Sequence, residues 1–356
     1  GKLTYFKAYG MQNAVANIPM RTDSIFRIYS MTKPIVSVGT MMLHEEAKLY
    51  LSEPVGKYLP NLSDMKVARA RKDPATGTDT VEIVPANQPI KIHDLLRHTS
   101  GFTYGFFGQS PARQKLKESG LANLNALNIP LNQFVARLAA LPLAYQPGRH
   151  WEYGRSTDVL GHLVEIISKE SLDIFLTASI FDPLGMFDTG FWVPEADWLR
   201  IAEPLTTTGE PQLIDVRSQP KLLAGGHGLV STAGDYLRFC QMLLNGGVLD
   251  GARVLGPKTV EYMTTNHLHD GISRAGPYYL PGPGYGFGLG FGVRKTDGVS
   301  AWPGSAGEFF LRGYAGTYFW VDPTEELIVV SMTQSVIHRV HYRMLLRNLV
   351  YQAIIK

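Results

Sequence analysis

The C-terminal third of the sequence predicts an antiparallel sheet with a helix packed on it. Residues 316–322 (GTYFWVD) and 327–333 (LIVVSMT) are rich in β-branched and aromatic side chains and are separated by a short polar turn. Residues 285–294 (YGFGLGFGVR) alternate glycine with apolar side chains, a period of two that is typical of a strand. Residues 338–355 have helical spacing of apolar residues and would cover this sheet. The apolar face of that helix comprises Leu345, Leu346, Leu349, Val350, Ala353 and Ile354.

Strand-like sequence also opens the chain, at residues 3–10 and 24–29. Between the two ends, apolar periodicity predicts a series of helices, at residues 35–44, 92–97, 131–141, 157–169 and 233–245. We therefore predict an α+β fold in which one antiparallel sheet, flanked by helices, is built from both termini. Residues 1–60 and 223–356 would form this discontinuous α/β domain, residues 61–222 a mostly helical domain, and the active-site cleft would lie between them.

Composition excludes several classes of function. The chain has 34 Lys plus Arg and 31 Asp plus Glu, a net charge of +3, without a dense basic stripe, so no nucleic-acid partner is expected. Cys240 is the only cysteine, so no intramolecular disulfide can form. No apolar run is long enough for a membrane span, and no signal peptide is visible, which favours a cytoplasmic location. The chain begins almost directly in strand-like sequence, so a segment upstream of it is conceivable. A leader peptide in that segment would change the expected location. Nothing in the sequence indicates a cofactor, a metal or an oligomeric state.

The strongest chemical signal is a Ser-x-x-Lys motif at Ser30 and Lys33. Three residues on a helix bring both side chains to one face, where a lysine of depressed pKa can take the serine proton. The same pattern occurs at Ser63/Lys66 and at Ser218/Lys221, in polar or proline-containing surroundings. Only Ser30 and Lys33 lie between a predicted strand and a predicted buried helix, so we predict that Ser30 is the nucleophile.

Several segments together resemble the serine β-lactamase and penicillin-binding-protein superfamily. Besides the Ser-x-x-Lys motif, they are residues 95–101 (LLRHTSG), 147–161 (PGRHWEYGRSTDVLG), 225–232 (GGHGLVST) and 316–323 (GTYFWVDP). They occur in the expected order over about residues 1–335, and they are most similar to the class C β-lactamase-like carboxylesterases, called family VIII esterases.

The resemblance implies a role for each matching residue. Ser30 would be acylated, Lys33 would be its base or would polarise the base, and Tyr153 would relay a proton to the leaving group. The backbone N–H groups of Ser30 and Tyr314 would form the oxyanion hole. Tyr314 is placed by matching Leu311-Arg312-Gly313 to the third family motif, Lys-Thr-Gly in β-lactamases.

Two departures from the β-lactamase pattern favour a neutral ester as the small-molecule substrate. Tyr153-Gly154-Arg155 stands where many β-lactamases have Tyr-x-Asn, and Leu311 stands where they have a lysine that holds the substrate carboxylate. Arg312 would replace that lysine only if its side chain turned inward. Predicted substrate-contacting residues are Tyr104, Phe107, Arg155, Leu311, Arg312 and Gly313.

Alternative functions remain open at this stage: a β-lactamase, a D,D-peptidase or an amide hydrolase with the same site, an acyltransferase, or a silent binding domain. Tyr104, Phe106 and Phe107 could equally line an acyl or alcohol pocket or be core or lid residues. His98 is expected to form a structural hydrogen bond near residues 99–101, and His267 and His269 are expected in a surface loop because no further metal ligand is indicated nearby.

Overall fold

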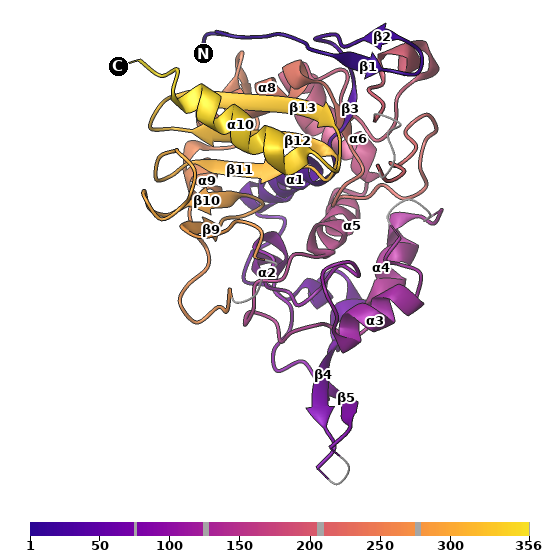
Figure 1. Ribbon diagram of the computed structural model, residues 1–356. Coiled ribbons are helices and arrows are strands. Elements are labelled where there is room, and N and C mark those ends of the chain that lie inside the picture. Colours follow the sequence, from indigo (N-terminus) through magenta and orange to yellow (C-terminus); the bar gives the residue numbers. More distant parts are fainter. Residues whose placement is uncertain (75–76, 124–127, 205–209, 275–278, 356) are drawn as a thin grey trace.

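The structure is a computed structural model that describes residues 1–74, 77–123, 128–204, 210–274 and 279–355 (Figure 1). The strands are β1 (Met11–Asn13), β2 (Ile18–Pro19), β3 (Phe26–Arg27), β4 (Lys66–Lys72), β5 (Asp79–Pro85), β6 (Val230–Ser231), β7 (Val248–Leu249), β8 (Ala252–Arg253), β9 (Tyr285–Phe287), β10 (Gly292–Arg294), β11 (Phe309–Arg312), β12 (Gly316–Asp322) and β13 (Leu327–Gln334). The helices are α1 (Thr32–Glu45), α2 (Ile92–Leu96), α3 (Pro111–Glu118), α4 (Leu131–Ala139), α5 (Ser156–Ser168), α6 (Leu172–Leu176), α7 (Asp182–Leu184), α8 (Ala233–Leu244), α9 (Pro257–Met263) and α10 (Arg339–Tyr351). Five short helical segments are η1 (Tyr29–Met31), η2 (Val55–Lys57), η3 (Pro60–Leu62), η4 (Thr177–Phe181) and η5 (Glu195–Arg200).

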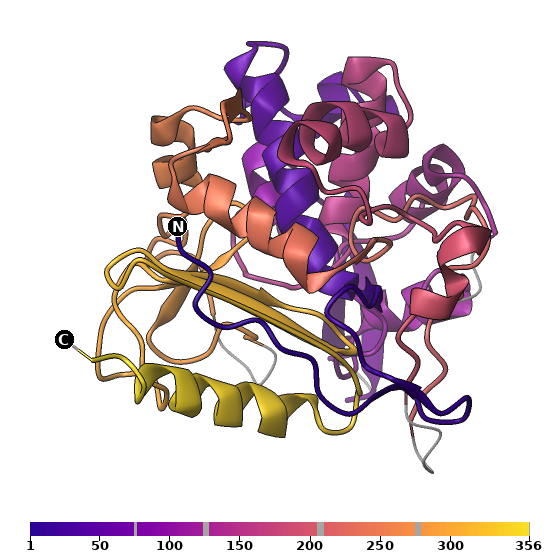
Figure 2. The ribbon, with the colours of Figure 1, turned by 90° about the horizontal axis from the view of Figure 1, so that it is seen from above.

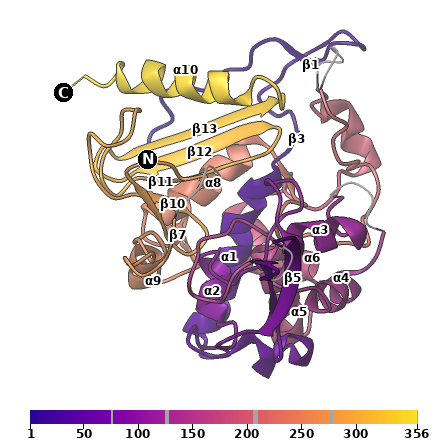
Figure 3. The ribbon, with the colours of Figure 1, turned by 60° about the horizontal axis from the view of Figure 1, so that its bottom comes forward.

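The predicted α+β fold is confirmed: five antiparallel strands form a sheet in the order β13-β12-β11-β10-β9, with helices on both faces. Figure 2 shows α10 on one face of this sheet and α8, with α1 behind it, on the other. Helices α3 to α6 lie on the side of α1 away from the sheet, together with the hairpin of β4 and β5 (Figure 3). The predicted boundaries of two domains, and the cleft between them, stay a prediction.

The alternation of β11 and β12 separates two sets of side chains. Phe310, Tyr318 and Trp320 face α10 and pack against Leu346 and Val350. Leu345 and Leu349, by contrast, are 44% and 48% exposed. The buried face of this helix is therefore narrower than predicted. The residues between the α10-facing ones, such as Leu311 and Phe319, point into the main core.

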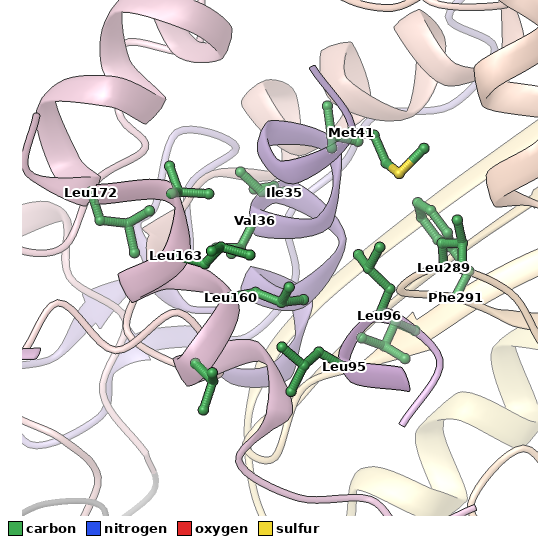
Figure 4. Packing of buried hydrophobic residues seen from close by; sticks show 14 of the residues in the cluster. Ile35, Val36, Met41, Leu95, Leu96, Leu160, Leu163, Leu172, Leu289 and Phe291 are labelled. Atoms are coloured by element: carbon green, nitrogen blue, oxygen red, sulfur yellow. The ribbon is translucent and has the colours of Figure 1, made fainter. Parts of the chain in front are cut away.

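The main core joins α1 to α5 and α2. Ile35 and Val36 of α1 lie close to Leu160 and Leu163 of α5, and Leu95 and Leu96 of α2 lie between these helices and the sheet side of the core (Figure 4). All of these side chains are at most 1% exposed. Because α1 is surrounded in this way, the residues in its first turn are held rigidly.

The N-terminal strands differ from the prediction. Residues 3–9 form no strand, and the five-stranded sheet includes no segment from the N-terminal part of the described chain. Instead, β3 pairs with β6. The side-chain amide of Gln334 accepts a hydrogen bond from the Arg27 N–H and donates one to the Arg27 carbonyl, at 3.3 and 3.2 Å. Side-chain bonds therefore take the place of a strand ladder between β3 and β13.

Candidate active site

Ser30 lies in the one-turn segment η1, which connects β3 to α1. The preceding residue, Tyr29, has a φ of 44°, in the left-handed region that non-glycine residues seldom occupy. Its ring is buried against Leu213 and Ala315, and its hydroxyl accepts a hydrogen bond from the Ile214 N–H at 3.1 Å. This anchored turn places the Ser30 hydroxyl at a half-buried position at the start of α1.

Lys33 lies one turn further on, and its side chain is fully buried. Its Nζ atom is 3.2 Å from Ser30 Oγ, 3.2 Å from the Tyr104 hydroxyl and 2.6 Å from the Gly226 carbonyl oxygen. The spacing of the motif therefore produces the predicted contact between amine and hydroxyl. Pro34 does not disturb it, because it is the third residue of α1 and a first turn tolerates proline.

Burial lowers the pKa of Lys33 from 10.5 to about 7. The carboxylate of Asp158 opposes this change and the guanidinium of Arg155 adds to it. At neutral pH a substantial fraction of Lys33 is therefore the neutral amine, which is the form that can accept a proton.

Tyr153 completes the group that the sequence predicted. Its ring lies beneath the Lys33 amine, with Nζ 4.6 Å from the ring centroid, and its hydroxyl is hydrogen-bonded to Ser30. Burial raises the pKa of Tyr153, and its hydrogen bond with Ser30 opposes that change. Tyr153 is far from Ser30 and Lys33 in the sequence, and the fold brings it to the same point.

Gly226 and Asp158 hold the amine of Lys33 from behind, and sequence reasoning did not identify either of them. The Gly226 N–H donates to Asp158 Oδ1 at 3.0 Å, and the carbonyl of the same residue accepts from Lys33. A Cβ atom at position 226 would lie 2.9 Å from the Asp158 carboxylate, so a larger residue there would press on this side chain. The glycine-rich run at residues 225–228 was the one available signal of this close approach.

Arg155 does not line the site, contrary to the prediction. Its side chain is fully buried; Nη2 donates to the Leu121 carbonyl at 2.7 Å, and the guanidinium lies over the Tyr104 ring, 5.0 Å from its centroid. Nη1 is 3.5 Å from Asp158 Oδ2. Arg155 therefore acts on Lys33 through its charge and through Asp158 and Tyr104, and it cannot touch a bound substrate in this structure.

The first two residues of the third motif, Leu311 and Arg312, lie on opposite faces of the sheet. Leu311 points into the core and is 7% exposed. Arg312, the next residue on the strand, points to the other face, where its guanidinium lies over the rings of Phe310 and Tyr318. The expectation that Arg312 could turn inward to hold a carboxylate is therefore wrong, because strand alternation directs it toward α10.

Gly313 and Tyr314 follow β11 and lie against the turn that carries Ser30. A Cβ atom on Gly313 would lie 2.6 Å from the Ile28 carbonyl oxygen, and the Tyr314 ring is 5.5 Å from that of Tyr29, centroid to centroid. Among the described residues, no acceptor pairs with the backbone N–H of Ser30 or of Tyr314. Both predicted oxyanion donors are thus available for an incoming oxygen atom.

Aromatic side chains pack around Tyr104 and Tyr153, the two tyrosines closest to the Lys33 amine. Tyr104 is 3% exposed, Phe107 is half-buried, and Phe106 is 50% exposed. The ring of Phe107 lies 6.3 Å from that of Tyr153, and Phe106 stacks on Tyr104 at 5.0 Å, centroid to centroid. These rings form an apolar border beside the polar group.

The remaining sequence candidates lie elsewhere. Ser63, Lys66, Ser218 and Lys221 of the other two Ser-x-x-Lys matches are exposed. His98 is the exception: its ring packs on Tyr153 at a centroid distance of 4.7 Å, and its Nδ1 atom has no hydrogen-bond partner among the described residues. His267 contacts His93, with 3.0 Å between ring nitrogens. The described residues contain no group of three potential metal ligands.

Comparison with known proteins agrees with this arrangement. The family model described as Beta-lactamase matches residues 1–349, almost the entire chain. The chain belongs to the beta-lactamase family. It is thus a serine hydrolase of that family, related to esterases and acyltransferases. No helix among the described residues is both long and apolar enough to span a membrane.

Three relatives illustrate the breadth of this family. Protein Rv1367c of Mycobacterium tuberculosis is 36% identical over 94% of this chain and 83% of its own length. Esterase EstB of Burkholderia gladioli is 33% identical over 64% of this chain and 53% of its own. The solved structure of EstCE1, described as a hydrolase with promiscuous acyltransferase activity, has a TM-score of 0.81 at 26% identity, over 98% of this chain and 90% of that one.

Proposed function

We propose that the protein is a carboxylesterase that hydrolyses short-chain esters of neutral small molecules through an acyl-enzyme on Ser30. The observation that carries this proposal is the 3.2 Å distance between Lys33 Nζ and Ser30 Oγ at a fully buried amine whose pKa is about 7. A neutral amine in that position can remove the proton of the serine hydroxyl at physiological pH.

The contacts of Lys33 determine how its hydrogens and lone pair are used. A neutral amine has two N–H groups and one lone pair. The carbonyl of Gly226 can only accept, so it takes one N–H, and the Tyr104 oxygen takes the other. The lone pair is then directed at Ser30, which donates its O–H to it.

The reaction then follows in two balanced steps. Ser30 Oγ forms a bond to the ester carbonyl carbon while its proton passes to Lys33, and the bond from that carbon to the leaving oxygen breaks as a proton is returned to the alcohol. Tyr153 touches both Ser30 and Lys33, so its hydroxyl is suited to relay this proton. Water then attacks the acyl carbon and gives its proton to Lys33 and Tyr153. The bond from that carbon to Ser30 Oγ breaks, Ser30 regains its proton, and the carboxylic acid is released.

The oxyanion of each tetrahedral intermediate would be bound by the backbone N–H groups of Ser30 and Tyr314. Both donors have no acceptor among the described residues, and both belong to the facing turns at residues 29–31 and 313–316. Preorganised donors of this kind commonly supply the largest share of the catalytic effect.

The surroundings of Ser30 favour a neutral ester over a β-lactam. Leu311 offers no charge, and Arg312 points to the opposite face of the sheet, so neither holds a substrate carboxylate. Phe106 and Phe107 offer apolar contact to an acyl or alcohol group.

The decisive test is the turnover of an aryl butyrate by the Ser30→Ala variant. Activity should fall by about 10⁴-fold or more, because the acylated atom is lost, and a fluorophosphonate should label Ser30 in the unmodified protein, as located by mass spectrometry. Ser63→Ala, the exposed serine of a second Ser-x-x-Lys match, is the matched control and should keep full activity. Normal turnover by Ser30→Ala would reject the proposal, and faster hydrolysis of a chromogenic cephalosporin than of the aryl ester would reject the substrate class.

Acyl transfer to an alcohol is a second candidate function, favoured by the similarity to EstCE1. The same acyl-enzyme would be attacked by an alcohol in place of water. Adding a short-chain alcohol to the aryl ester assay and measuring the new ester against free acid by chromatography separates the two functions. If the ratio of new ester to free acid equals that of the uncatalysed reaction in the same mixture of water and alcohol, hydrolysis is the function.

A further inference from the structure

The C-terminal helix reaches back to the loop that follows β11. Arg343, on α10, is bound through Nη2 to the carbonyl oxygen of Gly313, and the same atom donates to the Thr317 carbonyl at 3.1 Å. The side chain thus joins the two ends of the short loop at residues 313–317. None of the described carboxylates forms an ion pair with Arg343, so these carbonyls are its polar partners.

The carbonyl of Gly313 and the N–H of Tyr314 belong to one peptide group. In a trans peptide these two bonds point in opposite directions. Fixing the oxygen toward α10 therefore directs the N–H toward the other side of the loop, where the turn of Ser30 lies. The Tyr314 N–H has no acceptor among the described residues, whereas the oxygen of its own peptide group is held by a cation.

We propose that Arg343 is a positioning residue for the reaction: it orients and polarises the Gly313–Tyr314 peptide group so that the Tyr314 N–H binds the oxyanion more strongly. This inference rests on the proposed function and extends it to a residue on the far side of the sheet. A positive group at the carbonyl oxygen withdraws electron density from the peptide and strengthens its N–H as a donor. The interaction also fixes the donor before the oxyanion forms, so little reorganisation is needed.

Arg339 provides a matched control from the same helix. Its Nη1 donates to the Tyr314 carbonyl at 3.2 Å, which belongs to the next peptide group, whose N–H is that of Ala315. Arg339 and Arg343 therefore place similar charges beside the same loop, and only Arg343 is bound to the peptide group that carries the proposed donor. The other charged group close to Arg343 is Arg312, which lies over the Tyr318 ring.

The experiment compares Arg343→Met, Arg343→Lys and Arg339→Met in aryl ester hydrolysis, with active sites counted by the burst of product. Arg343→Met should lower kcat about tenfold and leave KM within about twofold, because the donor is weakened and not removed. Its affinity for a trifluoromethyl ketone should fall by the same factor as kcat/KM, with the pH midpoint of activity unchanged. Arg343→Lys should recover part of the loss, and Arg339→Met should lose less than about threefold.

Equal losses of kcat in Arg343→Met and Arg339→Met would overturn the inference, and so would a rise in KM with kcat unchanged. Either result would indicate a general effect of charge or of loop stability. Unchanged ketone affinity in Arg343→Met would also overturn it. The Ser30→Ala variant in the same assay keeps the two proposals separate. If Ser30→Ala is inactive and Arg343→Met is normal, the esterase proposal stands and the role of Arg343 is rejected.

Discussion

Two buried cations on opposite sides of the sheet illustrate how one fold treats charge in two ways. Lys33 is fully buried beside neutral oxygen atoms and aromatic rings, and its pKa falls to about 7. Arg347, on the buried side of α10, is 3% exposed but forms an ion pair with Glu308, and it donates from Nη1 to the Tyr318 hydroxyl at 2.6 Å and from Nε to the Pro303 carbonyl at 2.7 Å. The first amine is left able to lose its proton, and the second cation is held charged.

The difference separates a reactive group from a structural one. A buried charge without a close counterion shifts toward its neutral form, whereas a buried pair with all donors used fixes two elements together. Glu308 binds Tyr285 as well as Arg347, and thereby links β9 and the segment before β11 to α10. The following predictions test whether activity and stability divide between the two regions in this way.

The largest effect is expected from Lys33→Met. Activity toward an aryl ester should fall by about 10³-fold or more because the base is lost, while the free energy of unfolding in urea should stay equal or rise, since a buried amine is replaced by an apolar chain of similar size. Lys66→Met, at an exposed lysine of another Ser-x-x-Lys match, is the control and should change neither quantity. A large loss of stability in Lys33→Met would contradict the comparison.

Glu308→Gln should lower stability and leave activity almost unchanged, the opposite of Lys33→Met. Removing the carboxylate leaves Arg347 and Arg294 in a buried position without their counterion, at a cost of about 3 kcal/mol in the free energy of unfolding. The kcat of the folded fraction should be close to that of the unmodified protein. Urea titration measures the first quantity and burst-normalised kinetics the second, with the exposed Glu195→Gln as control. Unchanged stability would show that the pair contributes little.

The smallest effect should appear in the pH dependence. Below the Lys33 pKa of about 7 the amine is protonated, so kcat/KM should fall about tenfold per pH unit there and level off above it. Because the unfolded chain keeps this lysine protonated up to its ordinary pKa of 10.5, this group should make the protein more stable as pH rises from about 7 to 10.5.

Arg155→Met should raise the pH midpoint of activity, since Asp158 would then act on Lys33 without an opposing charge. A midpoint that does not move would exclude an influence of Arg155 on the pKa of Lys33.

Local pattern was sufficient to predict the sheet of the C-terminal third, α1, and the contact between Ser30 and Lys33. The place of Tyr153 beside them was predicted only through the family resemblance. Local pattern failed where the outcome depends on tertiary contacts. Residues 3–9 have strand-like composition, yet the edge of β13 is not paired with them. The burial of Arg155 beneath Tyr104 could not be foreseen, because arginine next to a candidate catalytic tyrosine suggests substrate contact as readily as a buried support.

Arg312 shows that some of the missing information was already present in the sequence. With Leu311 assigned to the core side, period two alone assigns Arg312 to the side of α10. The bond between Gly226 and Lys33, in contrast, joins residues far apart in the chain through a backbone carbonyl, and no side-chain pattern could have indicated it.

The left-handed backbone at Tyr29 has a consequence for how the hydroxyl of Ser30 is aimed. That conformation costs on the order of 1 kcal/mol or more for a residue with a side chain, and the packing of the Tyr29 ring against Leu213 and Ala315 is what retains it. The orientation of the Ser30 hydroxyl thus depends on the packing of an aromatic ring that takes no part in the reaction. Mutations in that small apolar cluster could silence the enzyme without altering any group that handles protons.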